Sequence, residues 1–235
     1  MSLVGRPNAG KSTLLNAFVG QKVAIVADKP QTTRTSIQGV VTTPEAQIVF
    51  VDTPGIHKAD SQLNKRLMNT VRASLEERDL LLFLVDATRA FTVEDRRALD
   101  MATKTGTPVV LVLTKVDLLP DKSKLLPLIE QYKAMHEFVD FVPVSATKRI
   151  GLDELRKVIL DHLPEGPAYF PEDYVTDQPE RFLAAELIRE KVLQVTQAGG
   201  AALRCSHGGP AGRRLLRSRA SMPPFAWSGR DRKPS

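Results

Sequence analysis

Cysteine is nearly absent from this chain, since Cys205 is the only one among 235 residues. A disulfide within the chain is therefore impossible, and a reducing compartment such as the cytoplasm is expected. The four histidines lack the spacing of a metal-binding motif. No apolar run reaches the ~18 residues of a membrane-spanning helix, and no signal peptide is visible at the N-terminus. The composition thus argues against a disulfide scaffold, a histidine metal site and a membrane-spanning protein.

Positive charge is concentrated at one end of the chain. The whole sequence has 33 Lys and Arg against 27 Asp and Glu, a net charge of +6. Residues 198–235 hold seven Arg, Lys233 and a single acid, Asp231, so the rest of the chain is close to neutral. Nucleic-acid binding inferred from overall charge would therefore rest on the tail alone.

The stretch Gly5-Arg6-Pro7-Asn8-Ala9-Gly10-Lys11-Ser12 fits the phosphate-binding P-loop pattern G-x-x-x-x-G-K-[ST]. The two glycines let the backbone turn its N–H groups toward phosphate oxygens. Lys11 would bring positive charge to the β- and γ-phosphates, and Ser12 a hydroxyl to Mg²⁺. An apolar strand precedes the loop and an apolar helix follows it. The strand, residues 1–4, is short for a central strand, so either it is trimmed or residues before it are missing.

Two later tetrads add to the P-loop. Asp52-Thr53-Pro54-Gly55 ends an apolar strand, where the Asp can hold Mg²⁺ through water and the Gly can offer its N–H to the γ-phosphate. Thr114-Lys115-Val116-Asp117 ends another strand, and a carboxylate there can accept from the N1–H and 2-amino groups of guanine. The lysine stem would lie over the base. Thr114 stands where the usual motif has Asn, so somewhat weaker anchoring is expected.

A fourth stretch completes the expected base pocket. Ser145-Ala146-Thr147 follows the apolar strand 138–144, and the Ala146 N–H can meet the guanine carbonyl. All four motifs are expected at the C-terminal ends of strands, where parallel sheets bind their ligands.

Strand and helix patterns alternate along the chain. Besides strands 109–113 and 138–144, the expected strands are 37–43, 47–51 and 80–85, and the expected helices after the first are 61–77, 92–103, 122–136 with an interruption at Pro127, and 152–163. This order predicts an α/β P-loop NTPase fold with a doubly wound, mostly parallel sheet and one antiparallel strand.

With these motifs in order, the chain resembles the Era family of translation-factor-class GTPases over residues 1–197. Residues 31–34 (QTTR) match the family's first switch, and residues 52–58 (DTPGIHK) match its second. Residues 163–174 and 178–191 resemble its linker and the first helix of its RNA-binding KH domain. The resemblance implies a G domain over 1–163, a linker over 164–179 and a first KH-like helix over 180–197.

The resemblance also implies roles for individual residues. Catalytic roles fall to Lys11, Thr33 and Gly55, with Mg²⁺ held by Ser12, Thr33 and Asp52 and with Asn8 as a candidate K⁺ ligand. Thr32 is the alternative to Thr33 as the Mg²⁺ ligand. Ile56 stands where Ras-like enzymes carry a water-orienting Gln. Nucleotide binding falls to Gly5, Arg6, Pro7, Asn8, Ala9, Gly10, Lys11, Ser12, Thr13, Asp52, Thr53, Pro54, Gly55, Thr114, Lys115, Asp117, Ser145, Ala146 and Thr147.

The implied function is a GTP/GDP switch with slow intrinsic hydrolysis. Its implied partners are the 3′ end of 16S ribosomal RNA and the 30S subunit, whose maturation it would assist as a cytoplasmic monomer. A peripheral contact with the inner face of the cell membrane stays open.

The resemblance stops after Gln197. Residues 198–235 are rich in Gly, Pro, Arg and Ser, with no amphipathic pattern, and we expect a disordered basic tail. Gly209-Pro210-Ala211-Gly212 fits the KH signature G-x-x-G formally, but Pro210 disfavours the helix that should follow. We therefore expect a truncated or frame-shifted KH domain and impaired RNA binding. The alternatives are a GTPase of the tRNA-modification type and a non-functional G-domain fragment.

Overall fold

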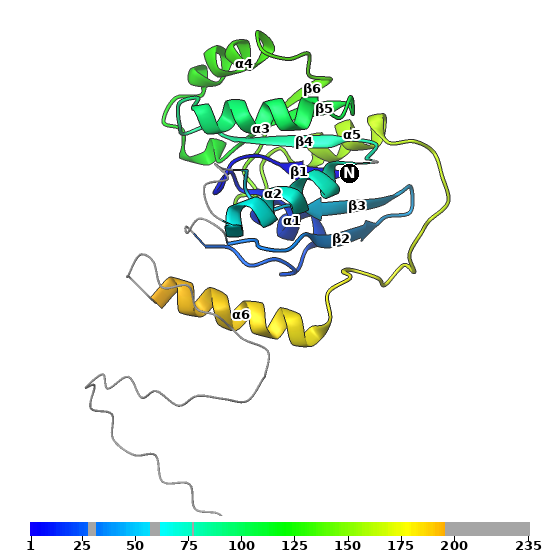
Figure 1. The fold of residues 1–235 in the computed structure, drawn as a ribbon. Helices are drawn as coiled ribbons and strands as arrows, with labels where there is room; N and C mark the ends of the chain where they lie inside the picture. The colour runs from blue at the N-terminus through cyan, green and yellow to red at the C-terminus, as the bar shows by residue number, and fades with distance from the viewer. Residues whose placement is uncertain (28–31, 57–61, 77, 196–235) are drawn as a thin grey trace, which may run out of the picture. The chain divides into compact units, whose positions relative to one another are not determined.

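The computed structural model describes residues 1–27, 32–56, 62–76 and 78–195. Its centre is a six-stranded sheet in the order β2-β3-β1-β4-β5-β6 (Figure 1). The strands are β1 (Ser2–Val4), β2 (Ile37–Thr42), β3 (Gln47–Asp52), β4 (Leu81–Asp86), β5 (Val109–Thr114) and β6 (Asp140–Pro143). Only β2 pairs antiparallel, with β3; the other pairs are parallel. The expected doubly wound sheet with one antiparallel strand is confirmed.

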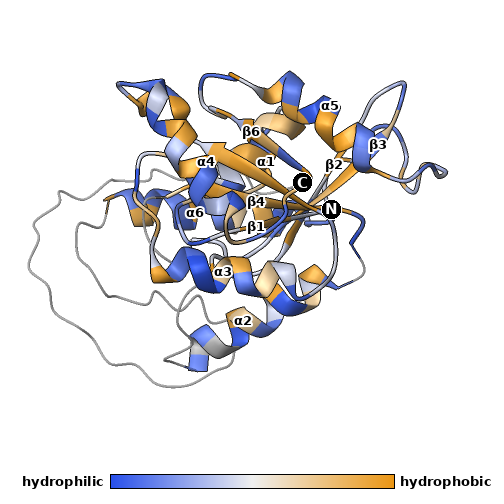
Figure 2. Ribbon diagram, turned by 90° about the horizontal axis from the view of Figure 1, so that it is seen from above, coloured by the Kyte–Doolittle hydropathy of each residue, from blue (hydrophilic) through white to orange (hydrophobic). Residues whose placement is uncertain are grey.

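Helices cover both faces of this sheet. They are α1 (Lys11–Val19), α2 (Gln62–Leu75), α3 (Val93–Thr103), α4 (Leu125–Lys133) and α5 (Leu152–His162), followed by α6 (Glu180–Val195). Figure 2 shows the apolar strands between α1 and α5 on one side and α2 and α3 on the other. Two apolar clusters result, one under α1 and α5 and one under α2, α3 and α4. Strands β4 and β5 are buried on both faces, which explains their uninterrupted apolar sequences.

Helix ends follow local chemistry, with one departure from expectation. The Thr92 hydroxyl accepts from the Asp95 N–H while the Asp95 carboxylate accepts from the Thr92 N–H, a capping box that starts α3 at the expected place. The expected interruption at Pro127 is wrong. A 3₁₀ turn over Lys122–Lys124 precedes α4, and Pro127 is the third residue of the helix. In the first turn its missing N–H has no helical acceptor to lose.

Part of the segment 164–179 contacts the sheet edge, with residues 175–177 beside β2 and residues 169–170 beside Gln47 at the start of β3. The Val40 N–H donates to the Val175 carbonyl over 2.8 Å, and the Thr176 hydroxyl donates to the Gln38 carbonyl over 2.6 Å. The side chain of Gln47 accepts from the N–H of Tyr169 and of Phe170. The segment expected as a linker thus satisfies backbone groups that an edge strand leaves open.

Helix α6 meets the rest of the compact unit of residues 1–197 through polar side chains. Glu190 is 1% exposed, pairs with Lys22 and accepts the Val26 N–H over 2.9 Å. Arg189 donates to the Thr32 carbonyl. In contrast, Ile188 is 67% exposed. The sequence left open whether the apolar face of this helix is exposed or packed; Ile188 is exposed, whereas Phe182 and Leu193 are half-buried.

No helix within the described ranges is long and apolar enough to cross a membrane.

Candidate nucleotide-binding site

The P-loop joins β1 to α1 through three residues with positive φ. They are Gly5 at 151°, Asn8 at 62° and Gly10 at 92°. A Cβ on Gly5 would lie 2.5 Å from the Leu84 carbonyl oxygen, so only glycine fits there. The chain therefore curls tightly around the N-terminus of α1, which is the geometry of an anion-binding nest.

Lys11 lies inside this curl. Its Nζ donates to the carbonyls of Gly5, over 3.2 Å, and Arg6, over 3.1 Å. Burial lowers the pKa of Lys11 to about 8, although the charge of Asp52 opposes the shift. The ammonium is thus held at the P-loop by groups that a phosphate could replace.

Three oxygen-bearing side chains meet beside Lys11. The Ser12 hydroxyl donates to Asp52 Oδ2 over 2.6 Å and lies 3.0 Å from the Thr33 hydroxyl, which itself lies 3.3 Å from Asp52 Oδ2. Burial raises the pKa of Asp52, although the charge of Lys11 and the bonds from Ser12 and Thr33 oppose the rise. Within the described part of the chain, the buried Asp52 Oδ1 has no hydrogen-bond partner. An all-oxygen set with an unpartnered carboxylate oxygen fits a hard cation such as Mg²⁺.

Gly55 lines the same pocket as Lys11 and lies against the P-loop. A Cβ there would lie 2.7 Å from the backbone N and Cα of Pro7, so the chain after β3 can approach the P-loop only without a side chain. The next residue, Ile56, is 1% exposed and belongs to the apolar cluster under α2, α3 and α4. Its side chain therefore lies in the core, where it cannot orient a water molecule.

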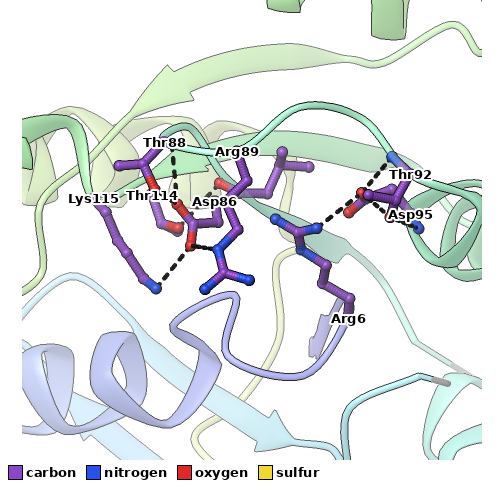
Figure 3. A network of polar contacts seen from close by, with 9 residues as sticks. Arg6, Asp86, Thr88, Arg89, Thr92, Asp95, Thr114 and Lys115 are labelled. Atoms are coloured by element: carbon purple, nitrogen blue, oxygen red, sulfur yellow. Dashed lines mark hydrogen bonds and ion pairs between the residues drawn. The ribbon is translucent and has the colours of Figure 1, made fainter. Parts of the chain in front are cut away.

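Thr114 anchors the P-loop to the sheet. Its hydroxyl lies 2.8 Å from the Ala9 carbonyl oxygen and 3.0 Å from that of Val85. The hydroxyl thus bonds protein carbonyls, and the somewhat weaker anchoring of the base expected at this position stays a prediction. Lys115 follows with a left-handed φ of 60°, and its Nζ pairs with Asp86 over 2.8 Å (Figure 3).

The loop after β6 is folded back on itself near the expected base pocket. Ser145 and Ile150 exchange two backbone hydrogen bonds of 2.9 and 3.0 Å. Thr147 Oγ1 lies 3.3 Å from Ser145 Oγ, and Ala146 is partly buried against the core. Asp117 lies in the 3₁₀ turn Val116–Leu118 directly after Lys115 and is half-buried.

Many of the expected site residues line one pocket at the edge of the sheet, and the others do not line it. Those that line the pocket are Pro7, Asn8, Gly10, Lys11, Ser12, Thr13, Thr33, Gly55 and Lys115. Those that do not line it are Gly5, Arg6, Ala9, Asp52, Thr53, Pro54, Thr114, Asp117, Ser145, Ala146 and Thr147. Thr53 instead bonds the Leu3 carbonyl, which fixes β3 against β1. His57 and Lys58 of the second-switch stretch, and the tail, lie outside the described residues.

The side chain of Arg6 points away from the pocket. Its Nη1 pairs with Asp95 Oδ2 over 3.3 Å, and both side chains are buried (Figure 3). Only the backbone of Arg6 is left for phosphate binding, and its guanidinium instead ties the P-loop to α3. Sequence reasoning also missed Ile25, Val26 and Ala27, which line the pocket, and Asp86. An acid at the end of an apolar strand, as at Asp52, was the available signal for Asp86.

Comparison with known proteins agrees with this geometry. The profile of the family described as 50S ribosome-binding GTPase matches residues 1–115. GTPase Era of Ruminiclostridium cellulolyticum is 48% identical over 193 residues, 82% of this chain and 64% of that protein. GTPase Era of Geobacter metallireducens is 48% identical over 197 residues, 84% of this chain and 66% of that protein. The chain thus spans somewhat less than two thirds of the length of these curated relatives.

Solved structures give the same result. A point variant of Era from Aquifex aeolicus, bound to GDP·AlF₄⁻, has a TM-score of 0.80 and 43% identity, covering 84% of this chain and 67% of that one. An Era structure in complex with MgGDPNP and nucleotides 1506–1542 of 16S ribosomal RNA matches equally well, at TM-score 0.80 and 43% identity. The GTPase of the tRNA-modification type is not favoured. From the P-loop, the sheet order and these similarities together, the chain belongs to the Era GTPase family.

Proposed function

We propose that the chain is a GTP-binding switch that hydrolyses GTP to GDP and phosphate. The observation that carries this proposal is the meeting of Lys11, Ser12, Thr33, Asp52 and Gly55 at one edge of the sheet. These residues come from three separate segments. They supply an ammonium group, a set of side-chain oxygens that could bind a metal ion, and a backbone that lies close to the P-loop.

The catalytic roles follow from position. The Lys11 ammonium and the P-loop N–H groups would stabilise charge that develops on the transferred phosphoryl group. Ser12 and Thr33 would hold Mg²⁺ directly, and Asp52 would hold it through water. Bound Mg²⁺ supplies neutralisation of the β- and γ-phosphate charge. Gly55 would donate its N–H to the γ-phosphate, so the loops that carry Thr33 and Gly55 would order with GTP and relax after hydrolysis.

Guanine selection is assigned to Asp117, with Ala146 and the neighbouring Ser145 and Thr147 on the other side of the base. The strand order supports this, because Asp117 follows β5 and residues 145–147 follow the neighbouring strand β6. A carboxylate accepts from both donors of guanine, whereas adenine lacks that pair.

Among the described residues of this site, we assign water activation to no side chain. Ile56 is buried, and Arg34 is exposed. We infer slow intrinsic turnover, on the order of 10⁻⁴ to 10⁻² s⁻¹, with K⁺ held at Asn8 in place of an arginine finger. Hydrolysis faster in K⁺ than in Na⁺ buffers would support this role.

The test of the proposal is phosphate release from GTP and ATP by the full chain with Mg²⁺. We expect release from GTP only, and at least a tenfold loss in Ser12→Ala, which removes a metal ligand. Arg96→Gln is the matched control, because it breaks only the exposed pair with Asp100. No release from GTP, or equal release from ATP, would contradict the proposal.

The cellular role is proposed from the family. Because a relative was solved with a 16S ribosomal RNA fragment, we infer action on small-subunit RNA and the 30S subunit, by a cytoplasmic monomer. The composition of residues 198–235 leads us to expect weak binding driven by charge. Anisotropy of that RNA fragment should show affinity that falls steeply with salt and does not distinguish a scrambled RNA. Tight, selective binding would show that the tail builds a working RNA site.

A further inference from the structure

The carboxylate of Asp86 ends β4 and collects donors from two directions. Its side chain is 3% exposed. Oδ1 accepts from the Thr88 N–H over 3.0 Å and from the Thr88 hydroxyl over 2.6 Å, while Oδ2 accepts from Lys115 Nζ over 2.8 Å. Arg89 lies farther off, at 3.7 Å, and is largely exposed. Figure 3 shows these groups converging on the one carboxylate.

The backbone around Lys115 is also held in place. Its φ of 60° lies in the left-handed region, which a non-glycine residue seldom adopts. Asp86 pairs with Thr114 in the β4–β5 ladder, and the Ala87 N–H donates to the Thr114 carbonyl over 3.0 Å. The acid is therefore fixed in register beside the turn that carries Lys115, and Lys115 lines the pocket.

The ion pair is not needed to hold the two strands together. Strands β4 and β5 are already joined over their full lengths, from Leu81 opposite Val109 to Asp86 opposite Thr114. The lysine side chain is 33% exposed, and pairs with a solvated member add little stability. What the pair does fix is the direction of the lysine side chain.

We propose that Asp86 is a positioning residue for the base pocket. It holds the Lys115 ammonium on the β4 side, so that the aliphatic stem of Lys115 stands as one wall against the guanine ring before nucleotide arrives. This assignment rests on the proposed guanine-nucleotide function. It predicts that Asp86 acts on base binding and leaves phosphate binding unchanged.

The test compares two probes of the same site in the full chain. Calorimetry measures Kd for Mg·GDP, which uses base and phosphate sites, and for inorganic triphosphate, which uses the phosphate site alone. Asp86→Asn should weaken Mg·GDP binding about tenfold, as expected for one lost charge-assisted bond, and leave the triphosphate Kd within about twofold. Arg96→Gln should change neither.

A double-mutant cycle separates positioning from a general structural role. If Asp86 acts through Lys115, then Asp86→Asn with Lys115→Gln should bind Mg·GDP no more weakly than Lys115→Gln alone. Thr88→Val is the gentler variant should Asp86→Asn unfold the chain. It removes one donor to Asp86 and should weaken Mg·GDP about threefold without affecting triphosphate.

Three results would overturn the inference alone: unchanged Mg·GDP affinity in Asp86→Asn or Thr88→Val, equal weakening of both probes, or additive effects with Lys115→Gln. Failure of the wild-type chain to bind Mg·GDP would instead overturn the proposed function, and this inference with it.

Discussion

Gly5 occupies a position where a side chain cannot be accommodated. Its φ is +151°, and a Cβ would lie 2.5 Å from the Leu84 carbonyl oxygen. We expect Gly5→Ala to lower the free energy of unfolding by at least ~2 kcal/mol, through backbone strain and this contact. Gly166 has an ordinary φ and nothing within 4 Å of a built Cβ, so Gly166→Ala should stay within about 0.5 kcal/mol. Urea denaturation of both variants checks this, and equal losses would contradict it.

Thr114 gives a second residue-scale prediction. Its hydroxyl donates to the buried carbonyls of Ala9 and Val85. Thr114→Val keeps the shape and removes the donor, so we expect a loss of about 1–2 kcal/mol in unfolding free energy. Thr114→Ser keeps the donor and should lose less. A valine variant as stable as the serine variant would show that these hydrogen bonds contribute nothing.

Asp86 should also make stability depend on pH. Burial alone would raise the pKa of its carboxyl, but the hydrogen bonds from Lys115 and Thr88 outweigh burial and hold the pKa below its usual value. A depressed folded-state pKa contributes stability above the unfolded pKa, and this contribution is lost as pH falls through the folded value. The stability difference between wild type and Asp86→Asn should therefore shrink below roughly pH 4. A difference that stays constant from pH 7 to pH 3 would contradict this account.

At the scale of elements, charged side chains make the hydrogen bonds that join α6 to residues 22–32. Glu190 is buried and accepts the Val26 N–H, and Val26 lines the pocket. In Glu190→Ala we expect faster hydrogen exchange at the Val26 amide, because its acceptor is gone. Lys191→Ala is the control, since Lys191 is exposed. Unchanged exchange at Val26 in the Glu190 variant would show that the helix does not protect this loop.

The elements also show what the sequence could predict. The strands over 80–85 and 109–113 were found because strands buried on both faces leave an uninterrupted apolar pattern. The start of α4 was not predicted correctly. A proline within a helical pattern of apolar residues is compatible either with an interruption of the helix or with its first turn. The pairs Arg6–Asp95 and Lys115–Asp86 join residues 89 and 29 positions apart. Such pairs depend on strand order and register, which local pattern does not contain, whereas the P-loop is contiguous and could be predicted.

At the scale of the molecule, one sheet edge collects residues from distant segments. The P-loop follows β1, Asp52 ends β3, Asp86 ends β4 and Lys115 follows β5. These strands are neighbours in the sheet, and parallel strands place their C-terminal ends together. Sheet order thus brings these strand-end residues to one edge, and the long connection between α1 and β2 adds Ile25, Val26, Ala27, Thr32 and Thr33 to the pocket lining.

We propose above that this edge of the sheet selects a guanine nucleotide through Asp117. Calorimetric titration of the full chain with Mg·GDP and Mg·ADP tests it most directly, with Asp117→Asn titrated against Mg·GDP and the xanthine analogue. We expect wild type to prefer GDP over ADP at least 100-fold, since adenine lacks the N1–H and 2-amino donors and would leave the Asp117 carboxylate unpaired. Asp117→Asn should lose that preference and gain xanthine binding, because an amide can donate to the 2-oxo group. Equal affinity for GDP and ADP in wild type, or an unchanged GDP preference in Asp117→Asn, would contradict the account.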